Sequence, residues 1–190
     1  LVTGDHGYIG SVLAPVLAAG GHEIIGLDTQ FYRGCDFGSE GVPVSRRVVD
    51  VRDVAPPDLV GFDAVVHLAA LSNDPLGDLN PGWTYAINRD AAVHVARAAK
   101  AAGVDRFVFA SSCSMYGAAK GGELVAEDAP LRPLTPYAES KVDAEAALLA
   151  LAIVAVTAAP APAAPFVRER VDLAAGASLR VDGAEEGNGL

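Results

Sequence analysis

The chain has 190 residues, of which 51% are hydrophobic and 20% are charged. This composition is typical of a globular protein with a sizeable core and excludes a disordered chain. The formal net charge of −10 argues against nucleic acid and anionic membrane surfaces as partners. An anionic substrate would therefore need a local arginine cluster.

The two cysteines, Cys35 and Cys113, lie far apart in the sequence. Their spacing fits no metal site, so we expect reduced thiols, no bound metal and a cytoplasmic protein. Residues 146–167 carry no charge and are long enough to span a bilayer. Three prolines interrupt this stretch, however, so we interpret it as a helix end followed by a buried strand and expect no membrane span.

Residues 1–10 have the pattern of an apolar strand end, a turn and a helix start, with glycines at positions 4, 7 and 10. Gly4 permits a tight turn, Gly7 lets the backbone approach a pyrophosphate, and Gly10 lets the helix pack closely on the strand. The free N–H groups of the first helical turn, which contains Tyr8 and Ile9, would hold the phosphates. Turn chemistry alone also produces such glycine patterns, so the interpretation depends on the residues beyond the turn.

A helix is predicted over residues 8–19, before the pair Gly20-Gly21. Its predicted apolar face consists of Ile9, Val12, Leu13, Val16 and Leu17. Residues 22–28 form a short apolar strand that ends in Asp28. A carboxylate at this strand end can accept a hydrogen bond from a ribose 2′-hydroxyl and would repel a 2′-phosphate, so Asp28 favours NAD over NADP. The alternative is a simple turn aspartate.

Two further strands come next in the chain. The third, within residues 44–51, is predicted to end at residues 48–51, which places Asp50 near an adenine. The fourth occupies residues 63–70 and ends in small residues that leave room for a cofactor. His67 in this strand is interpreted as a structural histidine, because a catalytic acid or base must reach the substrate.

Residues 71–81 are predicted to form a loop beyond the carboxyl end of the fourth strand, where open α/β sheets bind ligands. A helix is predicted over residues 84–102, with Ile87, Ala91, Val95, Ala98 and Ala99 on its apolar face. Asn88 lies within that face, where it would hold a water or a backbone carbonyl. A fifth strand over residues 106–110 leads into a serine-rich segment. This alternation predicts an α/β fold, a Rossmann-like doubly wound parallel sheet with helices on both faces.

Tyr137 and Lys141 open a further helix and are four residues apart, so they share one helical face. Free tyrosine has a pKa near 10 and is a poor base at neutral pH. A neighbouring ammonium, together with the positive charge of a bound nicotinamide, would stabilise the phenolate. A serine hydroxyl across the cleft would bind the same substrate oxygen. This spacing is common by chance, and the preceding dinucleotide pattern gives it meaning.

Over roughly residues 1–150 the chain resembles extended short-chain dehydrogenases/reductases of the NAD-dependent nucleotide-sugar epimerase/dehydratase family. The matching motifs are Thr3-Gly4-x-x-Gly7-x-x-Gly10, Asp28, Asp50-Val51, His67-x-Ala69-Ala70, Ser111-Ser112-x-x-x-Tyr116-Gly117 and Tyr137-x-x-x-Lys141. The resemblance implies that Tyr137 is the acid–base, that Lys141 tunes it and binds ribose, and that Ser112 holds the reacting oxygen. It implies a bound NAD and a nucleotide-sugar substrate. The expected NAD-binding residues are Gly4, Gly7, Tyr8, Ile9, Gly10, Asp28, Asp50, Val51, Leu68, Ala69, Ala70, Asn88, Ser111, Tyr137 and Lys141. The expected substrate residues are Ser72, Ser112, Cys113, Ser114 and Tyr137.

The resemblance also bears on the reaction. Sugar 4,6-dehydratases have Thr-Asp-Glu where this chain has Ser112-Cys113-Ser114. Without those acids dehydration lacks its proton carriers, so we expect an epimerase that oxidises a sugar hydroxyl and returns the hydride on the other face. Cys113 is interpreted as a small packing residue. The alternatives are an NAD(P)-dependent keto-sugar reductase, a dehydratase of the same family and, remotely, a non-catalytic NAD-binding regulator.

Past Lys141 the family pattern weakens. Residues 153–157 are predicted to form a sixth strand, after which the chain becomes rich in Ala and Pro. We therefore expect an NAD-binding domain over residues 1–157 and a partial or divergent substrate-binding region over residues 158–190, with the substrate lobe truncated or incomplete. The resemblance further implies a homodimer through the helices at residues 84–102 and after Tyr137.

Overall fold

The computed structural model describes residues 1–35, 44–72, 74–118, 125–126 and 128–158. In this part of the chain the strands form one parallel sheet in the order β3-β2-β1-β4-β5. The strands are β1 (Val2–Thr3), β2 (Ile25–Asp28), β3 (Ser45–Val48), β4 (Ala64–His67) and β5 (Arg106–Phe109). This order, which reverses direction at β1, confirms the predicted Rossmann-like doubly wound sheet.

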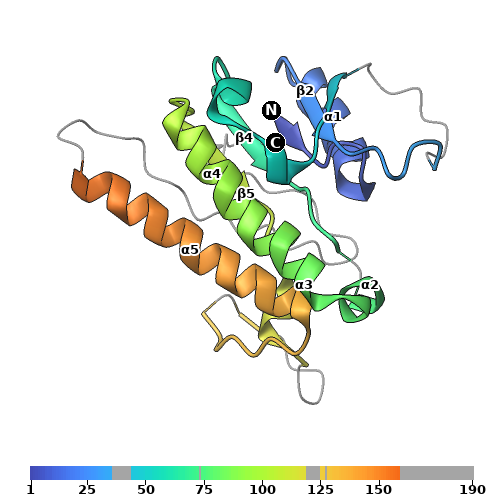
Figure 1. Ribbon diagram of the computed structural model, residues 1–190, viewed down its shortest axis with the longest axis vertical. Coiled ribbons are helices and arrows are strands. Elements are labelled where there is room, and N and C mark those ends of the chain that lie inside the picture. The colour runs from blue at the N-terminus through green and yellow to red at the C-terminus, as the bar shows by residue number, and fades with distance from the viewer. Residues whose placement is uncertain (36–43, 73, 119–124, 127, 159–190) are drawn as a thin grey trace, which may run out of the picture.

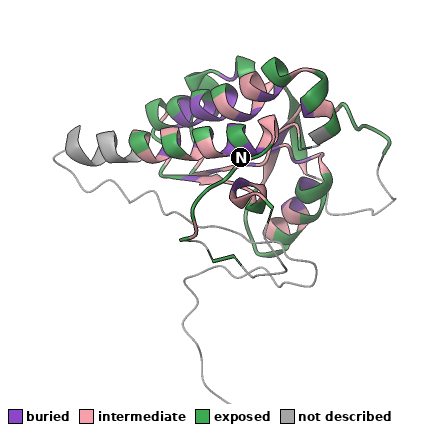
Figure 2. Cartoon of the chain, turned by 90° about the horizontal axis from the view of Figure 1, so that it is seen from below, coloured by how far each residue is buried: buried purple, intermediate pink, exposed green. Residues whose placement is uncertain are grey.

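Helices cover the sheet on both sides (Figures 1 and 2). Helix α1 (Tyr8–Ala19) lies on one face, and α4 (Ala92–Ala101) and α5 (Pro136–Ala158) lie side by side on the other. The shorter segments are η1 (Val51–Asp53), η2 (Pro56–Leu59), α2 (Asp74–Leu79), α3 (Pro81–Thr84), the π-helical η3 (Tyr85–Ala91) and η4 (Cys113–Tyr116). Among the described residues, no helix has both the length and the hydropathy needed to cross a bilayer.

Three predicted elements differ from the structure. The third strand ends at Val48, because the Asp50 side chain accepts the N–H of Arg52 and caps η1 instead. Residues 71–81, predicted as a loop, contain α2. Residues 153–157, predicted as a strand, continue helix α5 to Ala158. No proline lies between Pro136 and position 160, so no residue of the strongest helix-breaking type stops the helix earlier.

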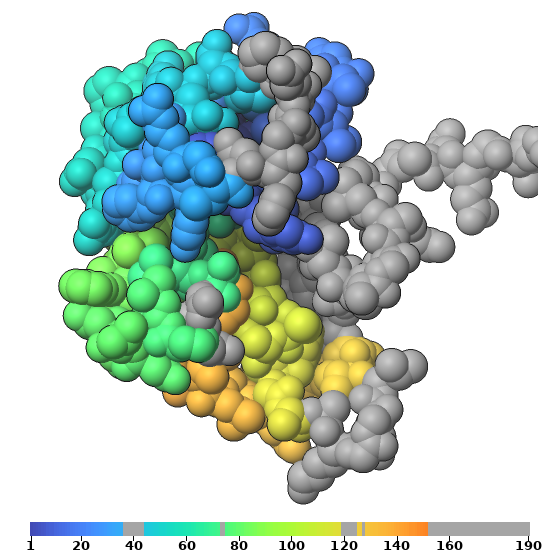
Figure 3. All heavy atoms as spheres, turned by 90° about the vertical axis from the view of Figure 1, so that its right-hand side faces the viewer, coloured from blue at the N-terminus to red at the C-terminus, as the bar shows by residue number. Residues whose placement is uncertain are grey.

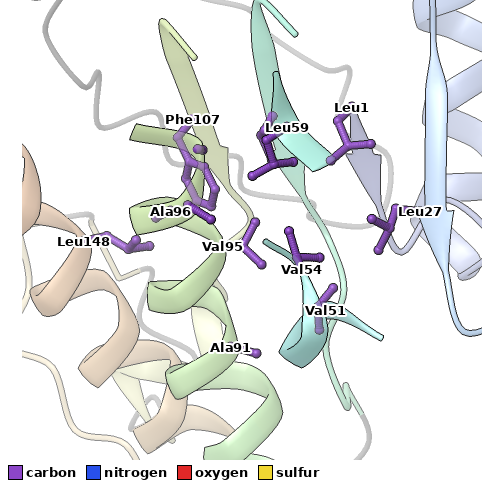
Figure 4. Packing of buried hydrophobic residues seen from close by; sticks show 13 residues of the cluster. Leu1, Leu27, Val51, Val54, Leu59, Ala91, Val95, Ala96, Phe107 and Leu148 are labelled. Atoms are coloured by element: carbon purple, nitrogen blue, oxygen red, sulfur yellow. The ribbon is translucent and has the colours of Figure 1, made fainter. Parts of the chain in front are cut away.

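The hydrophobic core fills the space between the sheet and the helices α4 and α5 (Figure 4). Leu27 and Phe107 come from strands, Val95 from α4 and Leu148 from α5 (Figure 4). Of the predicted apolar positions in the helix over residues 84–102, Ala91, Val95, Ala98 and Ala99 are all at most 4% exposed, and Ile87 packs partly buried against them. The small alanine side chains bring the helix backbone close to the sheet.

The predicted apolar face of α1 is wrong. Its buried residues are Gly10 and Ala14, whereas Val12 is 64% exposed and Val16 is 55% exposed. Ile9 is also exposed, and Leu13 and Leu17 are half-buried. Residues without bulk face inward because the helix backbone lies directly against the preceding turn, and the larger apolar side chains therefore lie to the sides and outside.

Candidate functional site

The turn at residues 4–10, called the glycine turn below, follows β1 at the carboxyl edge of the sheet. Gly4 has φ +71°, and its N–H donates to the carbonyl of Leu27 at 2.8 Å. A Cβ at Gly4 would lie 2.7 Å from the amide nitrogen of Ala69, at the end of β4. A Cβ at Gly10 would overlap the Gly4 carbonyl oxygen and lie 2.5 Å from Cα of Asp5. Two of the three glycines are therefore required by the packing of the turn itself.

Gly7 differs from the other two. It has an extended backbone (φ −81°, ψ 178°), and the single neighbour within 4 Å of an added Cβ is the Gly4 carbonyl oxygen at 3.3 Å. Gly7 is also the N-cap of α1 and provides no side chain to cap the helix. The first-turn N–H groups, including those of Tyr8 and Ile9, thus have no side-chain cap and are available to an anion.

Asp28 ends β2 beside the glycine turn. Its Oδ1 accepts the N–H of Gln30 at 2.6 Å, and its Oδ2 accepts the N–H of His6 at 3.4 Å. Each carboxylate oxygen can accept a second hydrogen bond, and the side chain is half-buried. A ribose hydroxyl could therefore be bound here without breaking either of these contacts. The uncapped helix start and this acceptor fit the diphosphate and ribose of a dinucleotide.

The Asp50 side chain is paired with Arg52. Its carboxylate accepts two hydrogen bonds from the Arg52 guanidinium, at 3.0 and 2.6 Å, and that side-chain pairing holds the pKa of Asp50 below its usual range. Val51 is 6% exposed and belongs to the core. A contact of Asp50 with adenine would therefore compete with Arg52 or share its carboxylate with it, whereas the Val51 side chain is packed in the core.

The end of β4 lies against the glycine turn. The N–H of Leu68 donates to the carbonyl of Thr3 at 3.0 Å, and Leu68, Ala69 and Ala70 are all half-buried. Beyond them, the buried amide of Asn88 accepts the N–H of Leu71 at 2.8 Å and donates to its carbonyl at 3.0 Å. Asn88 therefore holds a neighbouring backbone carbonyl, as one of the two predicted alternatives has it. It shapes the loop after β4 from the π-helical segment η3.

His67 is buried in the middle of the sheet. Its Nδ1 lies 2.9 Å from the Thr3 hydroxyl, and its ring stacks against those of Phe107 and Phe109. Burial, and secondarily the charge of Lys141, lowers the pKa of His67 to about 3. The imidazole is therefore neutral at physiological pH. With 1% exposure it is a structural residue, as the sequence interpretation has it.

Lys141 is 3% exposed and lies beneath the carboxyl end of β5. Its Nζ donates to the carbonyl of Ala110 at 2.9 Å and lies 5.7 Å from the ring centre of Tyr137 and 4.7 Å from that of Phe109. Burial lowers the pKa of Lys141 to about 8, so the ammonium still carries its charge at neutral pH. The predicted proximity of the lysine to the tyrosine is therefore realised, with a buried cation beside a half-buried phenol.

Three serines predicted at the site lie after β5. The Ser112 hydroxyl lies 2.9 Å from that of Ser114 and caps η4 by accepting the Ser114 N–H at 3.2 Å. The Ser111 hydroxyl instead donates to Glu145 on α5 at 3.1 Å and lies 2.9 Å from the sulfur of Met115. The Ser111 side chain therefore faces α5, and any contact with cofactor would fall to its backbone.

Cys113 corrects a prediction. It is exposed rather than packed, because η4 turns it outward while Met115, 1% exposed, fills the interior. Ser72, in the segment between β4 and α2, is exposed as well. Cys113 can therefore contact a ligand but contributes nothing to the core.

Sequence reasoning missed two interactions that shape the site. Glu145 follows Lys141 by one helical turn on the face that carries Tyr137, so the helical period was a usable signal. The ion pair between Asp5 and Arg46, at 2.5 Å, joins the glycine turn to β3. No local sequence pattern predicts the Asp5–Arg46 pair, because the two residues are far apart in the sequence.

The two groups of site residues lie at one edge of the sheet. On the face in Figure 3 the dark-blue N-terminal residues lie between the lighter-blue residues that follow them and the yellow segment after β5. Strand β4, which pairs with both β1 and β5, separates the glycine turn from Ser112, Tyr137 and Lys141. A parallel sheet with an uncapped helix after β1, an acid at the end of β2 and a buried lysine next to a half-buried tyrosine beside β5 defines a nucleotide-binding protein of the dehydrogenase/reductase class.

The comparisons place the chain more closely. Residues 1–155 match the family model described as NAD dependent epimerase/dehydratase family, and the chain belongs to this family. Over 145 residues it is 34% identical to UDP-glucose 4-epimerase of Streptomyces lividans, covering 75% of this chain and 44% of the relative.

Solved structures agree. MoeE5 in complex with UDP-glucose and NAD is similar with a TM-score of 0.69 and 32% identity, over 80% of this chain and 48% of that one. DesIV, the dTDP-glucose 4,6-dehydratase of Streptomyces venezuelae with NAD and TYD bound, is similar with a TM-score of 0.71 and 28% identity, over 82% and 52%. The chain thus spans about half the length of the relatives it matches.

Proposed function

We propose that this chain is the NAD-binding and catalytic half of an epimerase that acts on a nucleotide-activated sugar. The observation that carries the proposal is the buried Lys141 ammonium 5.7 Å from the ring centre of Tyr137, with Ser112 on the segment just after β5. Membership of the NAD dependent epimerase/dehydratase family supports it.

The glycine turn and Asp28 would hold the dinucleotide. The N–H groups at the start of α1 would bind its diphosphate, and the remaining acceptor capacity of Asp28 would bind a ribose hydroxyl. Asp28 also disfavours a 2′-phosphate by charge repulsion, so NAD rather than NADP is the proposed cofactor. When bound, NAD supplies the capacity to take a hydride from a sugar carbon and to return it.

Tyr137 would remove and restore the proton of the reacting hydroxyl. The phenolate needed for this step is favoured by the cation at Lys141, which is fixed by its hydrogen bond to Ala110 and shielded from water. Ser112 would donate a hydrogen bond to the same oxygen as it becomes a carbonyl. The proton therefore moves between the sugar oxygen and the Tyr137 oxygen in both directions of the cycle.

The segment Ser112-Cys113-Ser114 favours epimerisation over dehydration. Elimination of water needs an acid and a base beside the sugar, and this segment has hydroxyls and a thiol instead. The exposed position of Cys113 puts it within reach of a ligand, but a thiol does not replace the pair of carboxyl groups found at this segment in sugar 4,6-dehydratases. A reductase remains the second candidate, since Tyr137, Lys141 and Ser112 serve both reactions.

The substrate is proposed from the relatives. Several curated relatives are named UDP-glucose 4-epimerase, and MoeE5 was solved with UDP-glucose and NAD. We therefore take UDP-glucose as the first substrate to test.

We further propose a cytoplasmic homodimer in which α4 and α5 pair with their copies.

The test uses the full-length protein that contains this chain. Bound nucleotide is released by denaturation and identified by mass spectrometry, and UDP-glucose is then offered with NAD far below the substrate concentration. We expect tightly bound NAD and formation of the C4 epimer without net change in NADH. The Tyr137→Phe variant keeps its NAD and loses about a hundredfold to ten-thousandfold in rate, whereas Asp28→Arg loses the NAD.

Three results would redirect the proposal. NADH consumed in proportion to product would identify a reductase, and a product lighter by one water would identify a dehydratase. A protein that contains neither NAD nor NADH and binds NADPH instead would overturn the assignment of Asp28.

A further inference from the structure

Asp5, inside the glycine turn, has no solvent-exposed side-chain surface. Its Oδ2 accepts a hydrogen bond from Nε of Arg46 on β3 at 2.5 Å, and the Arg46 side chain is 29% exposed. The carboxylate lies directly over β2, because a Cβ at Gly26 would overlap it and lie 2.6 Å from Oδ1. The missing side chain of Gly26 thus makes the space that this carboxylate fills.

The Asp5–Arg46 pair includes a carboxylate that is shielded from water, and this affects its charge. Burial raises the pKa of Asp5, the hydrogen bond from Arg46 counteracts that rise, and the nearby Asp28 adds to it. Among the described residues Oδ1 of Asp5 has no hydrogen-bond partner, so Arg46 provides the main compensation of this carboxylate and the charge of His6 adds a smaller part. Without Arg46 a buried negative charge would remain next to the helix start that is proposed to bind a diphosphate.

The backbone of Asp5 is in close contact with the residues whose N–H groups form the turn. Its Cα would lie 2.5 Å from a Cβ at Gly10, and the preceding Gly4 is bonded through its N–H to Leu27 of β2. The backbone of Asp5 is therefore packed closely against the start of α1, and the peptide between Gly4 and Asp5 connects it to the rest of the turn. That peptide in turn bears the Gly4 carbonyl that accepts the N–H of Gly7 at 3.0 Å.

We propose that Arg46 is a positioning residue for the dinucleotide: by pairing with Asp5 it neutralises the glycine turn and holds it in the shape that binds a diphosphate. This inference rests on the proposed function, because it requires that the turn bind NAD. It assigns a contribution to cofactor affinity to a residue on the edge strand β3, outside every motif of the sequence.

The experiment compares Arg46→Met with Arg47→Met. Arg47 is the next residue on β3, and its guanidinium binds the carbonyl of Asp58 and lies over the ring of Phe62, away from the turn. Affinities for NAD+, ADP and adenosine are measured in the full-length protein by calorimetry or ligand-observed NMR. We expect Arg46→Met to lower the affinities for NAD+ and ADP about tenfold or more. Arg47→Met should leave both affinities near those of wild type.

A second variant separates charge from structure. Asp5→Asn combined with Arg46→Met removes both charges and keeps the shape of the buried side chain, so NAD+ affinity should return to within about threefold of wild type. Adenosine has no phosphate, and its affinity should be unchanged in all variants that fold, as monitored by thermal unfolding. A parallel loss of adenosine and ADP binding would indicate a merely structural defect and overturn the inference.

The remaining outcomes also decide. If wild type binds NAD+ and Arg46→Met binds it equally well, the inference fails while the proposed function stands. If the double variant is as weak as Arg46→Met alone, compensation of Asp5 is not the cause and the inference also fails. If wild type itself does not bind NAD+, the proposed function fails first.

Discussion

The two halves of the site, on either side of β4, are held in different ways. The glycine turn is fixed largely by backbone contacts, through the absence of side chains at Gly4 and Gly10 and the hydrogen bond from Gly4 to Leu27 of β2. Ser112, Tyr137 and Lys141 are instead brought together from distant segments, and the buried Lys141 is held by one hydrogen bond to Ala110. Added volume should therefore destabilise the fold most in the first half, whereas in the second half the buried charge of Lys141 should control the pH dependence of stability.

The largest effect should come from volume in the glycine turn. Gly10→Ala would push a methyl group into the Gly4 carbonyl and Cα of Asp5, and we expect a loss of about 3 kcal/mol in the free energy of unfolding. Gly7→Ala is the matched control, since its backbone is extended and an added Cβ meets a single atom at 3.3 Å. Gly7→Ala should lower the free energy of unfolding by less than about 1 kcal/mol and yet weaken the binding of NAD+. Chemical denaturation and calorimetry measure the two quantities, and equal destabilisation by both variants would contradict the comparison.

Charge in the second half should show in the pH dependence of stability. The folded pKa of Lys141 is about 8, below its ordinary value, so between about pH 8 and pH 10.5 the unfolded chain binds a proton that the folded chain does not. The free energy of unfolding of wild type should therefore rise with pH across this window relative to Lys141→Met, by about 3 kcal/mol in total. Parallel urea titrations of both proteins from neutral to alkaline pH test this. Curves that stay parallel would show that Lys141 is not buried as described.

The strand between the two halves should give a comparable dependence of stability per pH unit, at acid pH. His67 has a folded pKa of about 3 because of its burial, so below its ordinary pKa the unfolded chain takes up a proton that the folded chain refuses. Wild type should lose stability as the pH falls below about 6.5, at up to about 1.4 kcal/mol per pH unit more than His67→Gln. Glutamine can still pair with Thr3, which makes it the appropriate comparison. An identical acid dependence of the two proteins would rule out a buried neutral His67.

The same contrast explains what could be predicted from the sequence. The glycine turn, the position of Asp28 at the end of a strand and the Tyr137–Lys141 spacing each follow from a short run of sequence, so local patterns were sufficient to locate them. The orientation of α1 could not be predicted from apolar spacing, because Gly10 and Ala14 face inward to fit the turn, and that turn is held by β2 and β4. The exposure of Cys113 and the bonds from Ser111 to Glu145 and from Arg46 to Asp5 depend on long-range packing.

The π-helical segment η3 has one further consequence. Its Asn88 amide donates a hydrogen bond to the carbonyl of Leu71 and accepts one from its N–H. A single side chain thus forms the pair of backbone hydrogen bonds that a neighbouring strand would form at the end of β4. The path of the chain as it leaves the sheet is therefore set by a helix on the other side of the core. A shift of η3 would therefore reach the backbone at Leu71 directly through these two hydrogen bonds, without passing through the strands.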